Sequence, residues 1–322
     1  MVRFRRFRNT DPPHLADIWR SQVGQPGLAQ PVSVDLLEEH IFGKLYFDYE
    51  GLILALDESG RVLGFVHAAF GPDQARQWIS PQMGIVAMLR VRPEAYTDDL
   101  AAALVAQAEA YLTARGAREG LGGGARPYDP FYTGLYGGAE LPGVLESDTA
   151  FCTALAQRGF HPDQRRFIFR RDLADWQSPV DRRYLQFRRR LLVQVIVDPP
   201  PRDRWEALTT APFELTRFEL VPREGGPALA SLTIRELALC TACPVQRTAG
   251  IVQLEVVPAG RRQGLASFLM GESLRMLAGQ GFQTVEVHTA ENNPAGLGLL
   301  QKFGFEQRGQ GMVFRKSLCG SG

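Results

Sequence analysis

The chain has 322 residues, about twice the roughly 150 of a typical single domain, so its length predicts two domains. Apolar residues make up 45% and charged residues 22%, as in ordinary globular proteins. The formal net charge of +1 argues against a nucleic-acid or anionic-lipid surface. No apolar run approaches the roughly 20 residues that span a bilayer, so no membrane partner is expected.

The N-terminus and the cysteines place the chain among cytoplasmic proteins. The basic start has no apolar segment behind it, because Asp11-Pro12-Pro13 follows, so it is not a signal peptide. Four cysteines are too few for a disulfide framework in a chain of this length. Cys240-x-x-Cys243 has the spacing of half a zinc site or a redox pair, but no second pair accompanies it. We therefore expect reduced thiols and no metal site.

The first half predicts strands and helices that alternate along the chain. The apolar strand at 84–91 is expected to be buried on both faces. It precedes an alanine-rich helix that Gly116 stops. A glycine-rich stretch at 120–124 leads into an aromatic segment at 127–136, and neither is predicted as regular structure. The expected strands are 2–7, 52–56, 62–70, 84–91 and 166–171, and the expected helices begin near Pro12 and cover 34–42, 98–115 and 148–157.

The second half repeats the later part of this order. Each half has an apolar strand with a Val-x-Pro exit, a helix of about four turns, and a shorter helix ending in Gly-Phe. We interpret this as a duplicated α/β domain, with domains at 1–175 and 181–318. The expected strands are 191–197, 213–221, 228–236, 251–257, 284–289 and 312–316, and the expected helices are 264–278 and 294–303.

A strand-to-helix turn in the second half has the features of an anion-binding site. Arg261-x-x-Gly264-x-Ala266 follows a strand and opens a long helix. The glycine allows close approach of a phosphate, and the first helix amides and the helix dipole favour negative charge. Arg261 and Arg262 add charge-assisted contacts. An arginine-rich turn without a ligand is the alternative. The glycine spacing matches neither a Rossmann nor a Walker motif.

This segment resembles motif A of the GCN5-related N-acetyltransferases (GNAT), whose pattern is Arg/Gln-x-x-Gly-x-Gly/Ala. The stretch from Asn293 to Phe305 resembles the second family block, with Gly296 at the family's alanine position. The resemblance implies an α/β fold of two tandem domains, each a mixed, mostly antiparallel sheet flanked by helices. It also implies acetyl-CoA as co-substrate, bound by the second domain. By resemblance, the cofactor-binding residues are Val256, Val257, Arg261, Arg262, Gln263, Gly264, Leu265, Ala266, Ser267 and Asn293.

The first half is similar to the family in element order only. Its corresponding turn has no glycine, and Glu94, Asp98 and Asp99 would repel a pyrophosphate. We expect this domain not to bind acyl-CoA. A degenerate first domain before an intact second one is similar to the layout of mycothiol synthase-like tandem acetyltransferases.

The proton-handling residues usual in the family are missing. Leu300 stands at the position of the family's tyrosine acid, and Gly250 at the position of its glutamate. Acyl transfer to an amine needs a base, and we name Glu255 and His288 as candidates. For both, a structural role is the alternative: a surface carboxylate for Glu255 and a hydrogen-bonded core histidine for His288. Strict alternation directs Glu255 away from the face of Gly250, although a bulge would reverse that.

The aromatic loop of the first half is the candidate acceptor site, because loops that carry aromatic side chains are often binding loops. The alternative is a packed loop over a sheet edge. The candidate residues are Tyr128, Phe131, Tyr132 and Tyr136. We expect an N-acetyltransferase that acts on an amine of a small molecule or peptide. A non-catalytic acyl-CoA-binding or regulatory protein is the alternative.

Overall fold

The computed structural model describes residues 2–178, 182–237 and 247–319. These residues form a mixed α/β structure in two units. Unit 1 consists of Met1–Arg166, Pro201–Pro212 and Gly309–Gly322, and unit 2 of Phe167–Pro200 and Phe213–Arg308. These limits differ from the expected 1–175 and 181–318. Unit 1 also includes Pro201–Pro212 and Gly309–Gly322, and unit 2 begins at Phe167. That division stays a prediction about independently folding domains. No helix among the described residues is long and apolar enough to cross a membrane.

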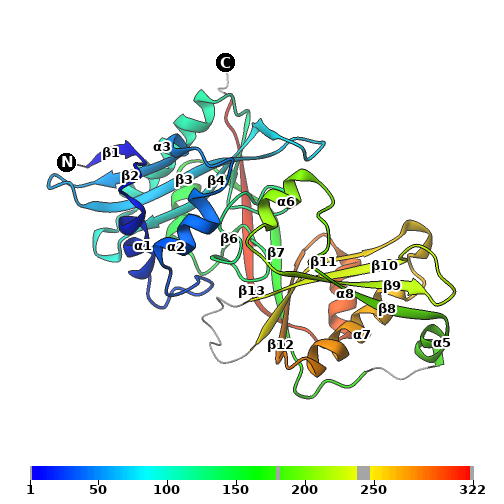
Figure 1. The fold of residues 1–322 in the computed structure, drawn as a ribbon. Helices are drawn as coiled ribbons and strands as arrows, with labels where there is room; N and C mark the ends of the chain where they lie inside the picture. Colours follow the sequence, from blue (N-terminus) through cyan, green and yellow to red (C-terminus); the bar gives the residue numbers. More distant parts are fainter. Residues whose placement is uncertain (1, 179–181, 238–246, 320–322) are drawn as a thin grey trace. The chain divides into compact units, whose positions relative to one another are not determined.

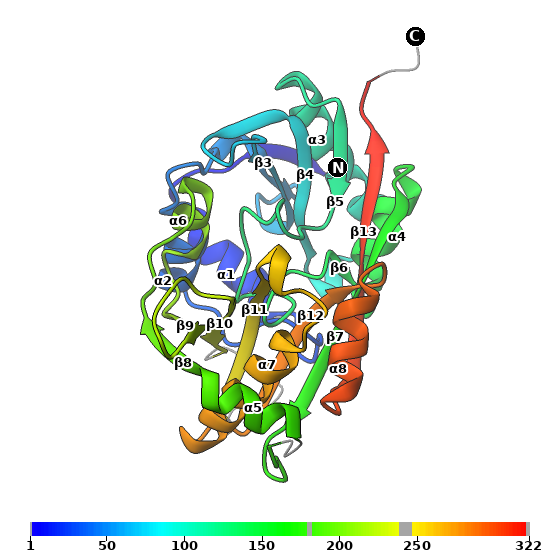
Figure 2. The same ribbon diagram turned by 90° about the vertical axis from the view of Figure 1, so that its right-hand side faces the viewer.

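Unit 1 is built around a mixed sheet with the strand order β1-β2-β3-β4-β5-β13, and β6 pairs with β13 (Figures 1 and 2). The last strand comes from the end of the chain and runs antiparallel to β5. The strands are β1 (Arg3–Arg6), β2 (Leu52–Leu56), β3 (Val62–Pro72), β4 (Ile79–Val91), β5 (Glu119–Gly122), β6 (Val144–Leu145) and β13 (Glu306–Ser317), which enters from unit 2. The helices are α1 (Pro12–Arg20), α2 (Val34–Leu37), α3 (Asp98–Ala114), α4 (Thr149–Gln157) and α6 (Arg204–Thr210).

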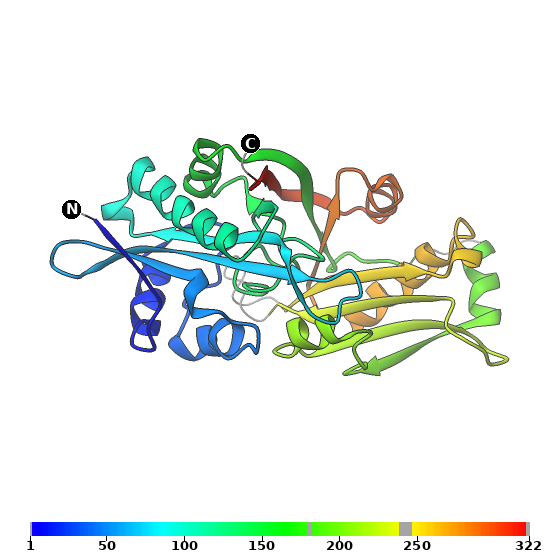
Figure 3. The same cartoon turned by 90° about the horizontal axis from the view of Figure 1, so that it is seen from above.

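The two faces of this sheet carry different helices. Helix α3 lies on one face, and α1 and α2 lie on the other (Figure 3). The side chain of Thr97 accepts a hydrogen bond from the amide of Leu100 and so caps α3. Leu104, Ala108 and Leu112 follow at helical spacing and are buried in the core between α3 and the strands. The predicted alanine-rich helix is therefore confirmed.

Several elements of the fold were not predicted, among them β5, α5 and α6. The glycine-rich stretch contains β5, in which a side chain on Gly122 would lie 2.6 Å from Leu155, so glycine is needed for close packing here. The expected helix at 34–42 is α2 followed by the π-helical turn Glu38–Phe42. Helices α5 and α6 were missed because both are short and lie in segments rich in charged or polar residues, although Tyr184 and Phe187 of α5 stand at helical spacing.

The strands of unit 2 are mixed in direction and follow the order β7-β12-β11-β10-β9-β8 (Figure 1). Strand β11 runs antiparallel to β10 and parallel to β12. The strands are β7 (His161–Asp172), which begins in unit 1, β8 (Leu191–Val197), β9 (Leu215–Pro222), β10 (Ala230–Glu236), β11 (Thr248–Val256) and β12 (Thr284–Ala290). The helices are α5 (Arg182–Arg190), α7 (Leu265–Gly279) and α8 (Pro294–Lys302).

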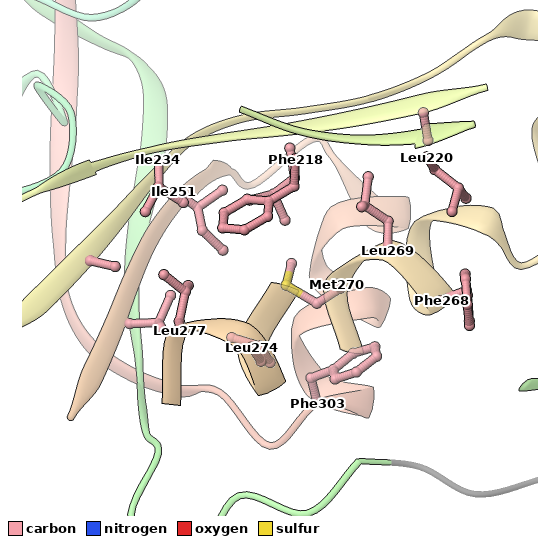
Figure 4. Close-up of a cluster of buried hydrophobic side chains, with 14 of the residues drawn as sticks. Phe218, Leu220, Ile234, Ile251, Phe268, Leu269, Met270, Leu274, Leu277 and Phe303 are labelled. Atoms are coloured by element: carbon pink, nitrogen blue, oxygen red, sulfur yellow. The ribbon is translucent and has the colours of Figure 1, made fainter. Parts of the chain in front are cut away.

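The core of unit 2 lies between this sheet and helix α7. Phe218, Ile234 and Ile251 point from three neighbouring strands toward Leu269 and Leu277 of α7 (Figure 4). All five side chains are buried. The opposite face of the same strands carries polar side chains, because strand residues alternate between the faces.

The two units repeat one arrangement of strands. In unit 1, β4 and β5 pair in parallel from Met83↔Glu119 to Val86↔Gly122. In unit 2, β11 and β12 pair in parallel from Thr248↔Thr284 to Ile251↔Val287. In each unit a bulge interrupts the antiparallel pair next to the parallel one. This supports the predicted duplication. The connection after the second parallel strand differs greatly: it spans residues 123–148 in unit 1 and only 291–293 in unit 2.

Candidate functional site

The segment between β11 and α7, the 257–264 turn, passes through two left-handed residues. A short 3-10 turn at Pro258–Gly260 is followed by Arg262 at φ 61° and Gly264 at φ 82°. Gly264 precedes the first residue of α7 and provides no side chain to cap the helix. The helix amides that have no intrahelical acceptor are those of Leu265, Ala266 and Ser267. Together with the helix dipole they favour an anion at this end of α7.

Three arginines surround the 257–264 turn. Arg261 and Arg262 are exposed, and Nε of Arg261 donates to the carbonyl oxygen of Val256 at 3.3 Å. Arg183 of α5 was not predicted. Its Nη2 donates to the carbonyl oxygen of Gln263 at 2.6 Å, and a Cβ atom on Gly264 would lie 3.3 Å from its Cζ. Sequence reasoning missed Arg183 because α5 is a short, arginine-rich helix and Arg183 lies 80 residues before Gln263 in the chain.

Strands β11 and β12 separate toward the 257–264 turn. Their parallel pairing ends at Ile251↔Val287, although β11 continues to Val256 and β12 to Ala290. On its other side, β11 stays paired with β10 as far as Val256. On the side that faces β12, the backbone groups of β11 after Ile251 therefore take no part in the β11–β12 pairing. An extended ligand can form strand-like hydrogen bonds there.

A bulge in β11 decides which side chains share its polar face. Thr233 of β10 pairs with Gln253, but the next residue, Ile234, pairs with Ile251, so Val252 is the extra residue. Because of this bulge, Gly250 and Glu255 lie on the same face, as their partners Arg235 and Ser231 do. Those partners are four residues apart, which places Glu255 roughly 13 Å along the strand from Gly250. Glu255 is exposed.

His288 lies on β12 and belongs to a buried polar cluster. Its Nε2 lies 3.1 Å from Oε1 of Glu286, and Oε2 of Glu286 accepts a hydrogen bond from Nε of Arg170 at 2.7 Å. The side chains of His288 and Glu286 are both 0% exposed. Nδ1 of His288 is buried and has no hydrogen-bond partner among the described residues. The sequence singled out His288 but missed Glu286 and Arg170, because strand pairing brings them together.

The second family block forms the start and core face of α8. Asn293 caps α8: its Oδ1 accepts from the amide of Gly296 at 3.0 Å, and its Nδ2 donates to Oγ1 of Thr289. A Cβ atom on Gly296 would lie 2.5 Å from that Nδ2, which explains glycine at this position. Leu300 is buried in the core of unit 2, so it offers neither a proton nor an exposed surface. The predicted cofactor contact of Asn293 stays a prediction.

The aromatic segment of unit 1 packs mainly inward. Phe131, Tyr132 and Tyr136 are buried, and only Tyr128 is partly exposed. The hydroxyl of Tyr132 lies 2.9 Å from Nδ1 of His67, and burial lowers the pKa of His67 to about 3. The hydroxyl of Tyr136 accepts from the amide of Leu145. These contacts match the packed-loop alternative. The assignment of the four aromatic residues to an acceptor site stays a prediction.

The corresponding turn of unit 1 has a different chemistry at the same place. Thr97 caps α3, and Asp98 and Asp99 occupy the first turn of that helix. Glu94 forms an exposed ion pair with Arg61 at 2.6 Å. The capped and acidic start of α3 is unsuited to an anion.

Two of the four cysteines belong to the described part of the chain. Cys240 and Cys243 lie outside the described residues. Cys152 and Cys319 are free thiols. Within residues 2–178, 182–237 and 247–319, no group of three or more His, Cys, Asp or Glu side chains is placed to hold a metal ion.

The second half of the chain is similar to a known protein family. Residues 198–305 match the model of the Acetyltransferase (GNAT) family. Over these residues the chain is similar to that family. No curated protein matches the chain. The matched segment begins at the end of β8 and includes β11, the 257–264 turn and α8.

Solved structures extend the likeness to the whole chain. A tandem GNAT protein from the clavulanic acid biosynthesis pathway shares 15% identity, with a TM-score of 0.68 and full coverage of both chains. A GCN5-related N-acetyltransferase from Sphaerobacter thermophilus shares 14%, with a TM-score of 0.60 over 98% of this chain and 96% of its own. A glucosamine N-acetyltransferase region of a fungal multi-domain enzyme shares 16%, with a TM-score of 0.70 over 98% of this chain and 38% of that one. The predicted tandem GNAT fold is confirmed.

Proposed function

We propose that the chain is an acetyl-CoA-dependent N-acetyltransferase. Unit 2 binds the cofactor and passes its acetyl group to an amine of a small molecule or peptide. The observation that carries this proposal is the 257–264 turn, where a left-handed Gly264 opens α7 beside Arg183, Arg261 and Arg262. The family of the domain, which supports an acetyltransferase-type activity, agrees with this proposal.

The residues of unit 2 fit the parts of acetyl-CoA. The amides of residues 263–267 and the three arginines suit the pyrophosphate, since backbone donors and guanidinium groups both bind phosphate oxygens. The backbone of β11 after Ile251 suits the pantetheine arm, because β12 no longer pairs with it there. Acetyl-CoA supplies the activated acyl group, as a thioester whose carbonyl carbon the amine attacks. Unit 1 does not fit the same cofactor, since Thr97 and two aspartates occupy the corresponding helix start.

Calorimetry with acetyl-CoA tests the binding step. Gly264→Glu adds a negative side chain at the start of α7, and we expect at least about tenfold weaker binding, which corresponds to roughly 1.4 kcal/mol. Gly281→Glu is a matched control: it has a similar φ of 84°, follows the other end of the same helix, and has no atom within 4 Å of an added Cβ. Both variants bear the same charge and a similar backbone strain. The absence of acetyl-CoA binding by the unaltered chain, or equal weakening in both variants, would refute the proposed binding site.

A non-catalytic acyl-CoA-binding role is the second candidate, and the burial of Leu300 favours it, because the family's tyrosine acid has no substitute at that position. Release of CoA thiol from acetyl-CoA, measured across a panel of amines, amino acids and peptides, separates the two functions. Turnover with any acceptor that depends on Gly264 eliminates the non-catalytic role. Binding of acetyl-CoA without turnover on every acceptor supports it.

A further inference from the structure

The carboxylate missing at Gly250 has a replacement on the neighbouring strand. Gly250 pairs directly with Glu286 of β12 in the parallel register. Paired residues of adjacent strands lie on the same face, with strands about 4.8 Å apart. Gly250 carries no side chain, so the Glu286 carboxylate has room on this face. Glu255, the candidate on β11 itself, lies about 13 Å away along the strand.

His288 extends this polar pair to the point where the strands separate. It follows Glu286 by two residues and so shares its face. The last pair between β11 and β12 is Ile251↔Val287, and His288 is the next residue of β12. It is therefore the first residue on this face at the point where β12 separates from β11. The Glu286 carboxylate contacts Nε2, which leaves Nδ1 buried and without a partner among the described residues. A buried nitrogen without a hydrogen-bond partner lowers the stability of the folded state, and such groups are found at functional sites.

We infer that His288 is the base of unit 2 and that Glu286, held by Arg170, positions it. This inference rests on the proposed acetyltransferase function. The Glu286 carboxylate accepts a hydrogen bond from Nε2–H, which holds the proton on Nε2 and keeps the Nδ1 lone pair available. Arg170 holds the other carboxylate oxygen at 2.7 Å and fixes the orientation of Glu286.

The proton transfers balance without any further group. The acceptor nitrogen attacks the thioester carbonyl carbon, and its proton passes to Nδ1 of His288. The tetrahedral intermediate collapses, the C–S bond breaks, and the thiolate leaves. The thiolate then takes the proton back from the imidazolium, which gives the amide, CoA thiol and neutral His288. A thiol with an ordinary pKa of about 8.5 is a good leaving group, so this route does not need the tyrosine absent at Leu300.

Unit 1 provides an internal comparison for this cluster. In its matching register, Ile85 stands in the place of Gly250 and Leu121 in the place of Glu286. Gly123, which follows Leu121 by two residues, stands in the place of His288. The scaffold therefore folds with apolar residues or glycine at all three positions. The polar cluster of unit 2 is not required by the fold, which supports a chemical role.

Kinetics with the purified full chain test the inference wherever an amine of the panel is turned over. We expect His288→Gln to lower kcat by about 100-fold or more, the usual contribution of a positioned base. Glu286→Gln is expected to lower kcat roughly tenfold to 100-fold, as for partners that orient a histidine. Both should leave the KM for acetyl-CoA and its calorimetric affinity nearly unchanged. His161→Gln, at an exposed histidine of unit 1, is the control. Loss of kcat in Glu255→Gln but not in Glu286→Gln would overturn the assignment.

Nitrogen NMR of ¹⁵N-histidine-labelled protein gives an answer that needs no turnover. The wild-type spectrum should show a proton on Nε2 of His288 and none on Nδ1, assigned by the signal lost in His288→Gln. Glu286→Gln should shift this tautomer population. A proton on Nδ1 in the wild type would refute the proposed base. If acetyl-CoA does not bind at all, calorimetry reports that failure separately, as a failure of the proposed function.

Discussion

Glu272 in the middle of α7 is expected to couple the stability of unit 2 to cofactor binding. Its carboxylate accepts hydrogen bonds from the hydroxyl of Tyr184 at 2.5 Å and from Nε of Arg188 at 2.9 Å. Both residues belong to α5, the helix that also carries Arg183 to Gly264. Glu272→Gln keeps the size of the side chain and removes its charge. The change should weaken the attachment of α5 to α7.

The magnitude follows from the exposure of the three donors to Glu272. The bond from the buried Tyr184 is the strong one, and hydrogen bonds to charged groups contribute about 1.5–3 kcal/mol. The side chains of Arg188 and Arg275 are 46% and 49% exposed, so solvent screens each ion pair with Glu272 to roughly 0–1 kcal/mol. Glutamine still accepts one bond from Tyr184. We therefore expect a loss of about 1–2 kcal/mol of unfolding free energy, or a Tm lower by about 4 °C.

Urea unfolding and calorimetry with acetyl-CoA check this prediction. Affinity for acetyl-CoA should fall a few-fold in Glu272→Gln, because Arg183 is held less firmly. Glu236→Gln is the control, since its ion pair with Arg247 is exposed and should contribute about 0.5 kcal/mol or less. Equal destabilisation by the two variants would refute the reasoning.

The same residue gives a pH dependence with a definite sign. Burial acts to raise the pKa of Glu272, but hydrogen bonds from Tyr184, Arg188 and Arg275 outweigh it and hold that pKa below its ordinary value. The stabilisation is therefore complete above the unfolded pKa of about 4.3 and is lost as the pH falls through the folded pKa. The difference between wild type and Glu272→Gln should be constant from pH 6 to 8 and shrink below about pH 4. A difference that grows in acid would contradict this cause.

Three further outcomes are expected. Leu300→Tyr should destabilise unit 2 by about 1–3 kcal/mol in thermal unfolding without raising activity, because position 300 lies in the core; a faster enzyme would contradict this. The signal of His67 should stay neutral in NMR down to pH 5, because burial lowers its pKa to about 3; titration near pH 6 would contradict the buried placement. Arg90→Ala should lower the free energy of unfolding by about 3–5 kcal/mol, because it leaves the buried Asp148 without its ion pair. Arg61→Ala removes an exposed ion pair and should lower the free energy of unfolding by about 0.5 kcal/mol or less. Equal losses in the two variants would contradict the burial argument.

Much of the regular structure followed from apolar spacing and helix signals. The helix predicted at 98–115 is α3, and the strand predicted at 191–197 is β8 with the same limits. The aromatic segment was harder, because the same tyrosines suit a binding loop and a packed one. Tyr132 and Tyr136 lie in the interior because His67 and Leu145 provide their partners. Those partners lie on other parts of the chain, and sequence spacing does not reveal such contacts.

The candidate site shows the same division between local and long-range information. The 257–264 turn was predictable because its glycine, arginines and helix start are contiguous. Glu286 was not, because its importance comes from the parallel pairing with Gly250. The bulge at Val252 also changed the face of Glu255, an outcome that strict alternation does not give. Arg183 was not predictable either, because it reaches the turn from the short, arginine-rich helix α5, and sequence spacing does not reveal that contact.

The backbone of the 257–264 turn gives an independent argument for a ligand. Arg262 at φ 61° is a left-handed residue without the freedom of glycine, and such a conformation costs about 1–2 kcal/mol. In unit 1 the matching helix start has a side-chain cap from Thr97 instead, worth about 1 kcal/mol over an uncapped end. The same scaffold therefore has a more stable solution available, and unit 2 does not use it. A strained, uncapped turn that exposes amides and arginines together agrees with the proposed anion site, because an anion bound to the folded state alone would offset the strain.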